Sequence, residues 1–457
     1  MAGIGFELRK ILKRDSLLSM MQAYSYAAVI SSGPWVLSIL GILIIGVLSY
    51  AIVVPIFTIV QFQVSITYVI AGSLIFTGFF QLSFTRFTAD RLFEKRIDLI
   101  LTNFHGVSLC VTVIGGVIGL LGVVILFPEQ TVFYRLLLLT AFVVMSNIWI
   151  ATIFLSGMKQ YREIVWLYLF GYTITVVAAL LLRRFNLGGL MAGFVIGQTM
   201  LLTGMLVLIL RNYPATKFIS FEFFNRQRNY PSLMLIGFLY NLGIWIDKFI
   251  FWYNPDTSQA IIGPLRASVI YDLPVFLAYL SIIPGMAIFL LRLETDFVEF
   301  YDALYEAVRS GGSLETIEQH RNGMVETIKL GIFEIVKIQT IAALLLIVVG
   351  DATLRWLGIS TLYLPLLYID VIAAGLQVVL LGILNVFFYL DKRPIVLALC
   401  CGFVLLNILL TSVSIFLGPA FFGYGFAIAL LITDLIGFHL LSIKLRTLEY
   451  DTFMLQR

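Results

Sequence analysis

The stretch YNLGIWIDKFIF (residues 240–251) places an acid, Asp247, directly beside a base, Lys248, inside an apolar run. Only 14 uncharged residues, Leu233 to Ile246, precede the pair in this run. Because a helix needs about 20 residues to cross a bilayer, the pair is predicted to lie at membrane depth, roughly 8 Å inside one face. Ionisable side chains at that depth are costly and usually face protein or water. The stretch therefore predicts a membrane-spanning helix with one polar face.

The composition of the whole chain agrees with this prediction. Of 457 residues, 60% are hydrophobic and 12% are charged, and the mean hydropathy is +1.01. A soluble protein of this length could not bury so much apolar surface. The three cysteines and three histidines are scattered without the spacing of a disulfide framework or a metal site. We therefore expect an all-α polytopic membrane protein without metal or cofactor, and basic residues confined to membrane flanks argue against nucleic-acid binding.

The apolar runs predict twelve membrane-spanning helices in two groups of six. An N-lobe covers residues 24–210 and a C-lobe covers 232–443, and we hypothesise that two six-helix bundles are related by pseudo-two-fold symmetry. The termini and the connections on their side hold 23 Lys and Arg residues, and the opposite connections hold 5. Because basic residues are concentrated on the cytoplasmic side of membrane proteins, both termini are predicted to be cytoplasmic.

Four segments outside the spans have a character of their own. Residues 1–23 fit an amphipathic helix on the membrane surface, either an orientation anchor or a gate or partner surface. Residues 211–231 are a basic, Pro-flanked cytoplasmic linker between the lobes, and 444–457 are a cytoplasmic tail. Residues 292–330 predict a cytoplasmic helical hairpin around Gly311 and Gly312, which either docks a partner or packs beneath the second half.

Proline and glycine mark helix bends and close helix contacts. Helix bends are predicted at Pro34, Pro274 and Pro284, because proline removes a backbone hydrogen bond. The series Gly189, Gly193 and Gly197 has the four-residue spacing that lets membrane helices pack closely.

Acidic residues within the spans are confined to the second half. Asp247, Asp272 and Asp370 each lie five to seven residues from the predicted outer end of their helices, and Lys248 shares that level. Such a cluster can bind a coupling cation, relay a proton, form a structural ion pair or reach the outer interface. Because adjacent helical residues point about 100° apart, we expect Lys248 to pair with Asp272 or Asp370 and Asp247 to face a cavity.

The first half instead offers neutral polar and aromatic side chains, which suit the hydroxyl groups and apolar ring faces of a sugar. The same side chains equally suit interhelical hydrogen bonds. Together with the polar face of the seventh span, the predicted cavity-lining residues are Tyr24, Tyr26, Ser31, Ser32, Asn147, Trp149, Tyr240, Asn241 and Asp247.

Motifs of common enzyme classes are missing from the sequence. There is no GxxxxGK[ST] nucleotide-binding loop and no set of nucleophile, base and acid with a recognisable spacing. The predicted first outer loop, residues 50–63, carries no charge, whereas a membrane glycosyltransferase would be expected to have acidic residues there. We therefore predict that the chain is not an enzyme.

Twelve spans in two halves, with a polar and Pro-bent first helix, resemble the superfamily of multidrug antiporters and polysaccharide flippases. Three segments more specifically resemble the PelG family, the inner-membrane transporters of Pel exopolysaccharide systems: MAGIGFELRKILKRDS (1–16), YAAVISSGPW (26–35) and NLGIWIDKFIFW (241–252). The resemblance covers the whole chain. It implies export of an N-acetylgalactosamine-rich polymer across the bacterial inner membrane, in a complex with the cytoplasmic glycosyltransferase PelF and with PelD and PelE.

From the residues and the resemblance together, we expect a polysaccharide exporter whose central cavity between two lobes is lined by the first and seventh helices. The first-half spans lack the buried Arg and Lys of flippases for lipid-linked precursors, which favours a growing polymer over a pyrophosphate-linked substrate. Energy from an ion gradient and energy from polymerisation are both open. The alternatives are a non-transporting membrane scaffold for an exopolysaccharide synthase and a cation-coupled small-molecule antiporter.

Overall fold

The computed structural model describes residues 16–49, 55, 57–158, 160–213, 217–225 and 230–448. Most of the predicted surface helix at 1–23 lies outside the described residues, and its last seven residues form the start of the first helix, α2. The tail at 444–457 is described only up to residue 448, and parts of the linker at 211–231 also lie outside.

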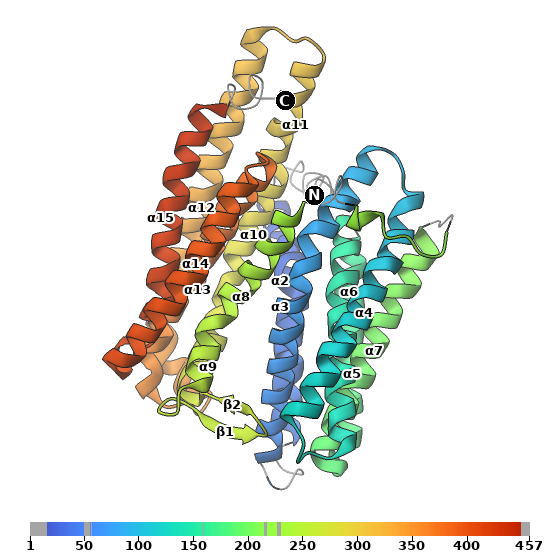
Figure 1. The fold of residues 1–457 in the computed structure, drawn as a ribbon. Coiled ribbons are helices and arrows are strands. Elements are labelled where there is room, and N and C mark those ends of the chain that lie inside the picture. The colour runs from blue at the N-terminus through green and yellow to red at the C-terminus, as the bar shows by residue number, and fades with distance from the viewer. Residues whose placement is uncertain are drawn as a thin grey trace. The chain divides into compact units, whose positions relative to one another are not determined.

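Nearly all the described residues are helical, as the fold-class prediction required (Figure 1). The long helices are α2 (Leu17–Ser49), α3 (Phe57–Phe93), α4 (Asp98–Leu126), α5 (Val132–Gly157), α6 (Tyr161–Leu182), α7 (Asn186–Asn212), α8 (Pro231–Tyr253), α9 (Val269–Tyr279), α10 (Ile283–Leu291), α11 (Phe297–Arg309), α12 (Leu314–Trp356), α13 (Leu364–Tyr389), α14 (Arg393–Leu417) and α15 (Tyr424–Arg446).

The described residues contain ten stretches that are long and apolar enough to cross a membrane, or eleven when the two halves of α2 count as one span. One of the ten, Tyr161–Asn212, consists of α6 and α7 joined by a 3₁₀ turn. The exact number of twelve spans stays a prediction. α2 is bent at a break beside Pro34, where the sequence predicted a bend.

The chain forms two compact units, which we name and describe separately. The N-terminal unit comprises residues 33–245 and 251–268, and the C-terminal unit comprises residues 1–32, 246–250 and 269–457. The N-terminal unit thus contains α3 to α7 and most of α8. The C-terminal unit contains α9 to α15, the start of α2 and the part of α8 that carries Asp247 and Lys248.

The N-terminal unit is held together by aromatic packing and by close helix contacts. Buried rings of Phe84, Phe104 and Phe154 stack or tilt against one another between α3, α4 and α5. α6 and α7 pack so closely that a Cβ built on Gly193 would lie 2.3 Å from the Cα of Ala179. This confirms the close approach predicted from the glycine spacing, because only a residue without a side chain fits there.

A two-stranded sheet, β1 (Gln259–Ile262) and β2 (Leu265–Ala267), follows α8 and departs from a purely helical chain. Gly263 turns the hairpin with φ +54°, a value that favours glycine. The Arg266 guanidinium donates to the backbone oxygen of Trp252 at 3.1 Å and to Ser258 Oγ at 2.9 Å. It thereby satisfies a carbonyl that the end of α8 leaves without a helical partner.

In the C-terminal unit, α9 and α10 belong to one apolar stretch that is broken once. A 3₁₀ turn separates α9 from α10, and Pro284 lies in the first turn of α10, where proline is tolerated. Pro274 lies inside α9 without ending it. α10 then continues through a π-helical segment, Arg292–Asp296, into α11.

The predicted helical hairpin is formed by α11 and the start of α12, with Gly311 at φ +70° in the turn. α12 continues unbroken for 43 residues, through the predicted boundary near residue 330 between the hairpin and the next span. At about 1.5 Å per residue this helix is roughly 65 Å long. It therefore extends well beyond a hydrocarbon core of about 30 Å. α13, α14 and α15 pack side by side in the same unit (Figure 1).

Candidate functional site

The charged pair on α8 is buried within the C-terminal unit. Asp247 is 0% exposed and Lys248 is 7% exposed. The Lys248 ammonium donates to both carboxylate oxygens of Asp247, at 3.0 Å to Oδ2 and 3.3 Å to Oδ1. The expectation that these neighbours would not neutralise each other is therefore wrong. The Cβ directions do diverge, but the long, flexible stem of lysine lets its terminal nitrogen return to the adjacent carboxylate.

Residues from two further helices, α9 and α15, contact the pair. The Tyr271 hydroxyl, on α9, donates to Oδ2 of Asp247 at 2.7 Å. The Lys248 nitrogen lies 5.2 Å from the ring centre of Tyr279 and 4.9 Å from that of Phe426. Aromatic faces attract a cation, and the attraction is stronger away from water. Asp247 therefore does not face an open cavity, and Lys248 is held by one carboxylate and two rings.

Asp370, on α13, is the unsatisfied member of this group. It is 3% exposed, and neither of its carboxylate oxygens has a hydrogen-bond partner among the described residues. It lies within electrostatic range of Lys248 and Asp247. Gly423, at φ +84° just before α15, lies against it, since a Cβ built there would be 2.9 Å from Oδ1. The fourth predicted member, Asp272, is half-buried in the first turn of α9.

We call Asp247, Lys248, Tyr271 and Asp370 the inner cluster. The Lys248 ammonium binds Asp247, and Asp370 lies near the pair without a hydrogen bond, so full ionisation of the two carboxyl groups and the ammonium would leave one excess negative charge among them. An uncompensated buried charge is expensive, and a proton or a cation on one carboxyl removes it. Within the described ranges, no group of three or more His, Cys, Asp or Glu side chains is arranged to hold a metal ion.

The polar side chains predicted to line a cavity mostly bond to protein atoms. In the N-terminal unit, Asn147 accepts from Ser108 Oγ at 2.6 Å and donates to Thr112 Oγ1 at 2.9 Å. The Trp149 indole donates to Ser73 Oγ at 2.9 Å, and Asn241 donates to the Gly237 backbone oxygen at 3.0 Å. These geometries are those of interhelical and intrahelical hydrogen bonds.

The remaining predicted cavity residues lie on α2 and α8. Ser31 and Ser32 both donate to the Ala28 backbone oxygen, within their own helix. The side chains of Tyr24, Tyr26 and Tyr240 are half-buried. Tyr24 lies within electrostatic range of Arg292, which brings it beside a second charged site.

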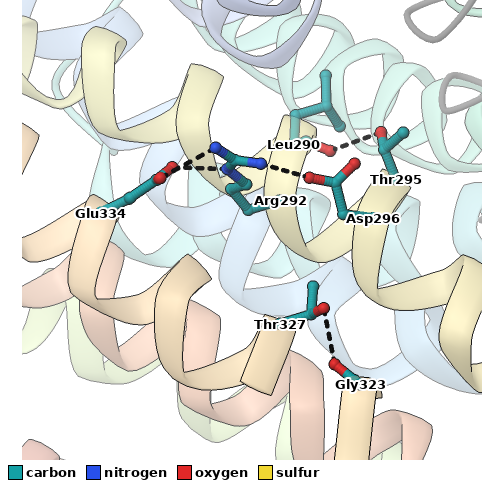
Figure 2. A network of polar contacts seen from close by, with 7 residues as sticks. All are labelled: Leu290, Arg292, Thr295, Asp296, Gly323, Thr327 and Glu334. Carbon is teal, nitrogen blue, oxygen red and sulfur yellow. Dashed lines mark hydrogen bonds and ion pairs between the residues drawn. The ribbon is translucent and has the colours of Figure 1, made fainter. Parts of the chain in front are cut away.

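That second site, which sequence reasoning missed, is centred on Arg292 (Figure 2). Its guanidinium donates to Glu334 at 2.6 and 2.9 Å and to Asp296 at 2.7 Å. A cleft of about 280 Å³ adjoins it, lined by Arg292, Asp296, Glu299, Phe300, Thr327, Leu330 and Glu334. Carboxylates, a guanidinium and a ring face are groups that can contact a sugar. The four-residue spacing of Arg292 and Asp296 could have indicated that these two side chains meet on one helix face. The contact with Glu334 could not be predicted from spacing, because Glu334 is 42 residues away from Arg292.

A buried acid stabilises the helix junction beside this cleft. Glu294, which is 4% exposed, accepts from Asn385 Nδ2 at 2.8 Å and from the Tyr389 hydroxyl at 3.2 Å. It therefore ties the π-helical segment to α13. The sequence analysis placed this residue in the cytoplasmic helical hairpin, residues 292–330.

Comparison with known proteins gives a family and a fold. A family described as "PelG: Putative exopolysaccharide Exporter (EPS-E)" matches residues 1–453. No similar sequence is found among curated proteins.

Solved structures of several transporters resemble the chain. One is a multidrug resistance MATE family transporter of the MOP superfamily, solved in outward-facing and inward-facing conformations. Both conformations are 12% identical to this chain, with TM-scores of 0.63 and 0.62. Each similarity covers 93% of this chain and 96% of the other. A MATE structure in a bent conformation has 12% identity and a TM-score of 0.65, covering 99% of both chains. These similarities show the fold.

Proposed function

Because this chain belongs to the PelG family of exopolysaccharide exporters, we propose that it carries an N-acetylgalactosamine-rich polysaccharide outward across the inner membrane of a bacterium. The chain is a membrane transporter in exopolysaccharide export. We place both termini in the cytoplasm, supported by the distribution of Lys and Arg. The proposed partners are the glycosyltransferase PelF together with PelD and PelE, as the family resemblance implies.

We propose further that the inner cluster couples export to the binding and release of a proton or a monovalent cation. The observation that supports this role is the Asp370 carboxyl, which is buried, lacks hydrogen-bond partners among the described residues and lies near the Asp247–Lys248 pair. A purely structural ion pair needs only Asp247 and Lys248. A second carboxyl held beside them without hydrogen bonds is costly, and ionisable groups in spans with such a cost usually carry a function.

In this proposal the side chains divide the work. Asp370 exchanges the proton or cation. The Lys248 ammonium moves toward Asp370 when that carboxyl is charged and toward Asp247 when it is neutral. Tyr271 keeps Asp247 oriented toward Lys248. Tyr24 and the cleft beside Arg292 are proposed to contact the glycan, because they combine aromatic faces with charged hydrogen-bonding groups.

The test is secretion of the polysaccharide by cells that carry Asp370→Asn, measured together with the amount of the protein in the membrane. Asparagine has nearly the size of aspartate but cannot exchange a proton, so we expect normal protein levels and secretion lowered by about tenfold or more. Asp370→Glu should retain part of the secretion. Asp351→Asn, at a half-exposed residue of α12 paired with Arg355, is the matched control and should secrete normally. Normal secretion by Asp370→Asn would refute the coupling role.

A further inference from the structure

Another buried carboxyl of the C-terminal unit, Asp434, lies away from the inner cluster. It is 1% exposed, and neither carboxylate oxygen has a hydrogen-bond partner among the described residues. It is on α15, within a stretch long and apolar enough to span a membrane. Buried polar groups in native proteins almost always have partners, so one without them needs an explanation.

The packing of α15 against α14 fixes the level of Asp434. Gly425 lies against the backbone of Thr411, and Gly437 lies against Leu399. Both contacts correspond to the same antiparallel register, because the second contact lies 12 residues after the first on α15 and 12 residues before it on α14. In this register Asp434 is level with residues 402 and 403 of α14, where the sequence has Gly and Phe.

The packing of α15 against α13 gives the same result. Gly423 lies against Asp370, and Gly437 lies against Ile383, so these two helices run in parallel. Asp434 is therefore level with Leu380 and Leu381 of α13, two apolar residues of which Leu380 is buried. The 11 residues between Gly423 and Asp434 correspond to roughly 16 Å along α15. Asp434 and Asp370 are thus two separate carboxyl groups at two depths.

Ionisable groups on the neighbouring helices are too distant to neutralise an Asp434 carboxylate. On α13 the only charged residue is Asp370. On α14 the titratable groups are Cys400 and Cys401 near this level, and Arg393 about nine residues away in the register. On α15, His439 is exposed and Lys444 is ten residues further along. Lys248 contacts Phe426, about two turns from Asp434.

We propose that Asp434 is a second proton-binding site of this transporter, independent of the inner cluster. An ionised carboxylate without a counter-ion or hydrogen bonds is too costly at this depth, so the group carries a proton in the described conformation. Its proton leaves for water only in a conformation that brings water or a polar partner to it. Release at Asp434 is therefore linked to movement of α15 against α13 and α14.

The proposal is tested on the purified full-length protein in lipid by infrared difference spectroscopy between acidic and alkaline buffers, repeated in heavy water. A protonated buried carboxyl has a carbonyl band that shifts when its proton is exchanged for deuterium and disappears when the group ionises. We expect Asp434→Asn to lose one such band and Asp370→Asn to lose a different one. Asp351→Asn should leave both bands unchanged.

Two results would overturn the proposal. One is an Asp434→Asn spectrum identical to that of the unaltered protein. The other is an Asp434 band that neither titrates nor shifts in heavy water, which is the behaviour of a sealed structural acid. Asp434→Glu keeps the carboxyl and serves as the second variant if the asparagine form fails to fold. Because the two bands are assigned separately, failure at Asp434 leaves the role of Asp370 to be judged on its own band and on secretion.

Discussion

The Lys248 ammonium lies 3.0 Å from Oδ2 of Asp247, the residue that directly precedes it in α8. Both side chains are buried, and both belong to the part of α8 that packs into the C-terminal unit. Since the two charges form an ion pair within one helix, each charge is already compensated when α8 lies in the membrane. The Tyr271 hydroxyl and two aromatic rings then fix the pair from α9 and α15.

We predict that Lys248→Met lowers the free energy of unfolding by about 3–5 kcal/mol, because it leaves the Asp247 carboxylate buried without its partner. Asp247→Asn should lower it by less, because Asp370 lies within electrostatic range of Lys248. The double variant should recover most of this loss, since two neutral side chains need no compensation. Thermal unfolding of the purified variants checks the prediction. Equal losses in the single and double variants would contradict it.

The same variants separate stability from transport. If the pair is part of the coupling site, the double variant restores the amount of protein in the membrane but not polysaccharide secretion. Recovery of both would indicate that the pair is structural, with the coupling role left to Asp370 alone.

Tyr271→Phe removes only the hydroxyl that donates to Asp247 at 2.7 Å. A hydrogen bond to a charged group contributes about 1.5–3 kcal/mol, so we expect a loss of that size in the free energy of unfolding. Tyr368→Phe, at a half-buried tyrosine of α13, is the control, and it should change stability by less than about 0.5 kcal/mol. A Tyr271→Phe variant as stable as this control would mean that the hydroxyl does not support Asp247.

The Arg292–Glu334 contact ties the junction of α10 and α11 to α12 through two parallel hydrogen bonds. Both side chains are about one-third exposed, so solvent screens the pair. A double-mutant cycle with Arg292→Gln and Glu334→Gln should give a coupling energy of about 1 kcal/mol, at the upper end for exposed ion pairs. A coupling energy near zero would show that the contact is not maintained in the membrane-embedded protein.

Much of the fold was predictable because it depends on local patterns. Apolar runs predict the spans, and the glycines at four-residue spacing predict where α6 and α7 touch. The burial of Asp247 and Lys248 followed from counting residues to the membrane face. Their mutual pairing could not be predicted in this way. The directions of the Cβ atoms do not show that the long, flexible lysine side chain can turn back to the neighbouring carboxylate.

The parts that could not be predicted depend on residues far apart in the chain. Glu334 meets Arg292 across 42 residues, and Glu294 is buried only because α13 supplies Asn385. Glu294 belongs to the segment predicted as a cytoplasmic hairpin, residues 292–330, whereas Glu334 lies in the next predicted span. The β-hairpin after α8 was missed because its two strands are very short. The guanidinium of Arg266, on the second strand, contacts the end of α8 rather than another strand.

Gly193 offers a test of the packing that sequence alone predicted. Replacing it by alanine would bring the new methyl group to 2.3 Å from backbone atoms of Ala179 on α6. Backbone cannot rotate away as a side chain can, so α6 and α7 must separate, and we expect a loss of stability of about 3 kcal/mol, the upper part of the range for overpacked sites. Gly122→Ala is the matched control, since a Cβ there meets no atom within 4 Å among the described residues, and alanine should be neutral or slightly stabilising. The amount of each variant in the membrane and its thermal unfolding provide the measurement. Equal behaviour of the two variants would show that α6 and α7 are less closely packed than the described contact.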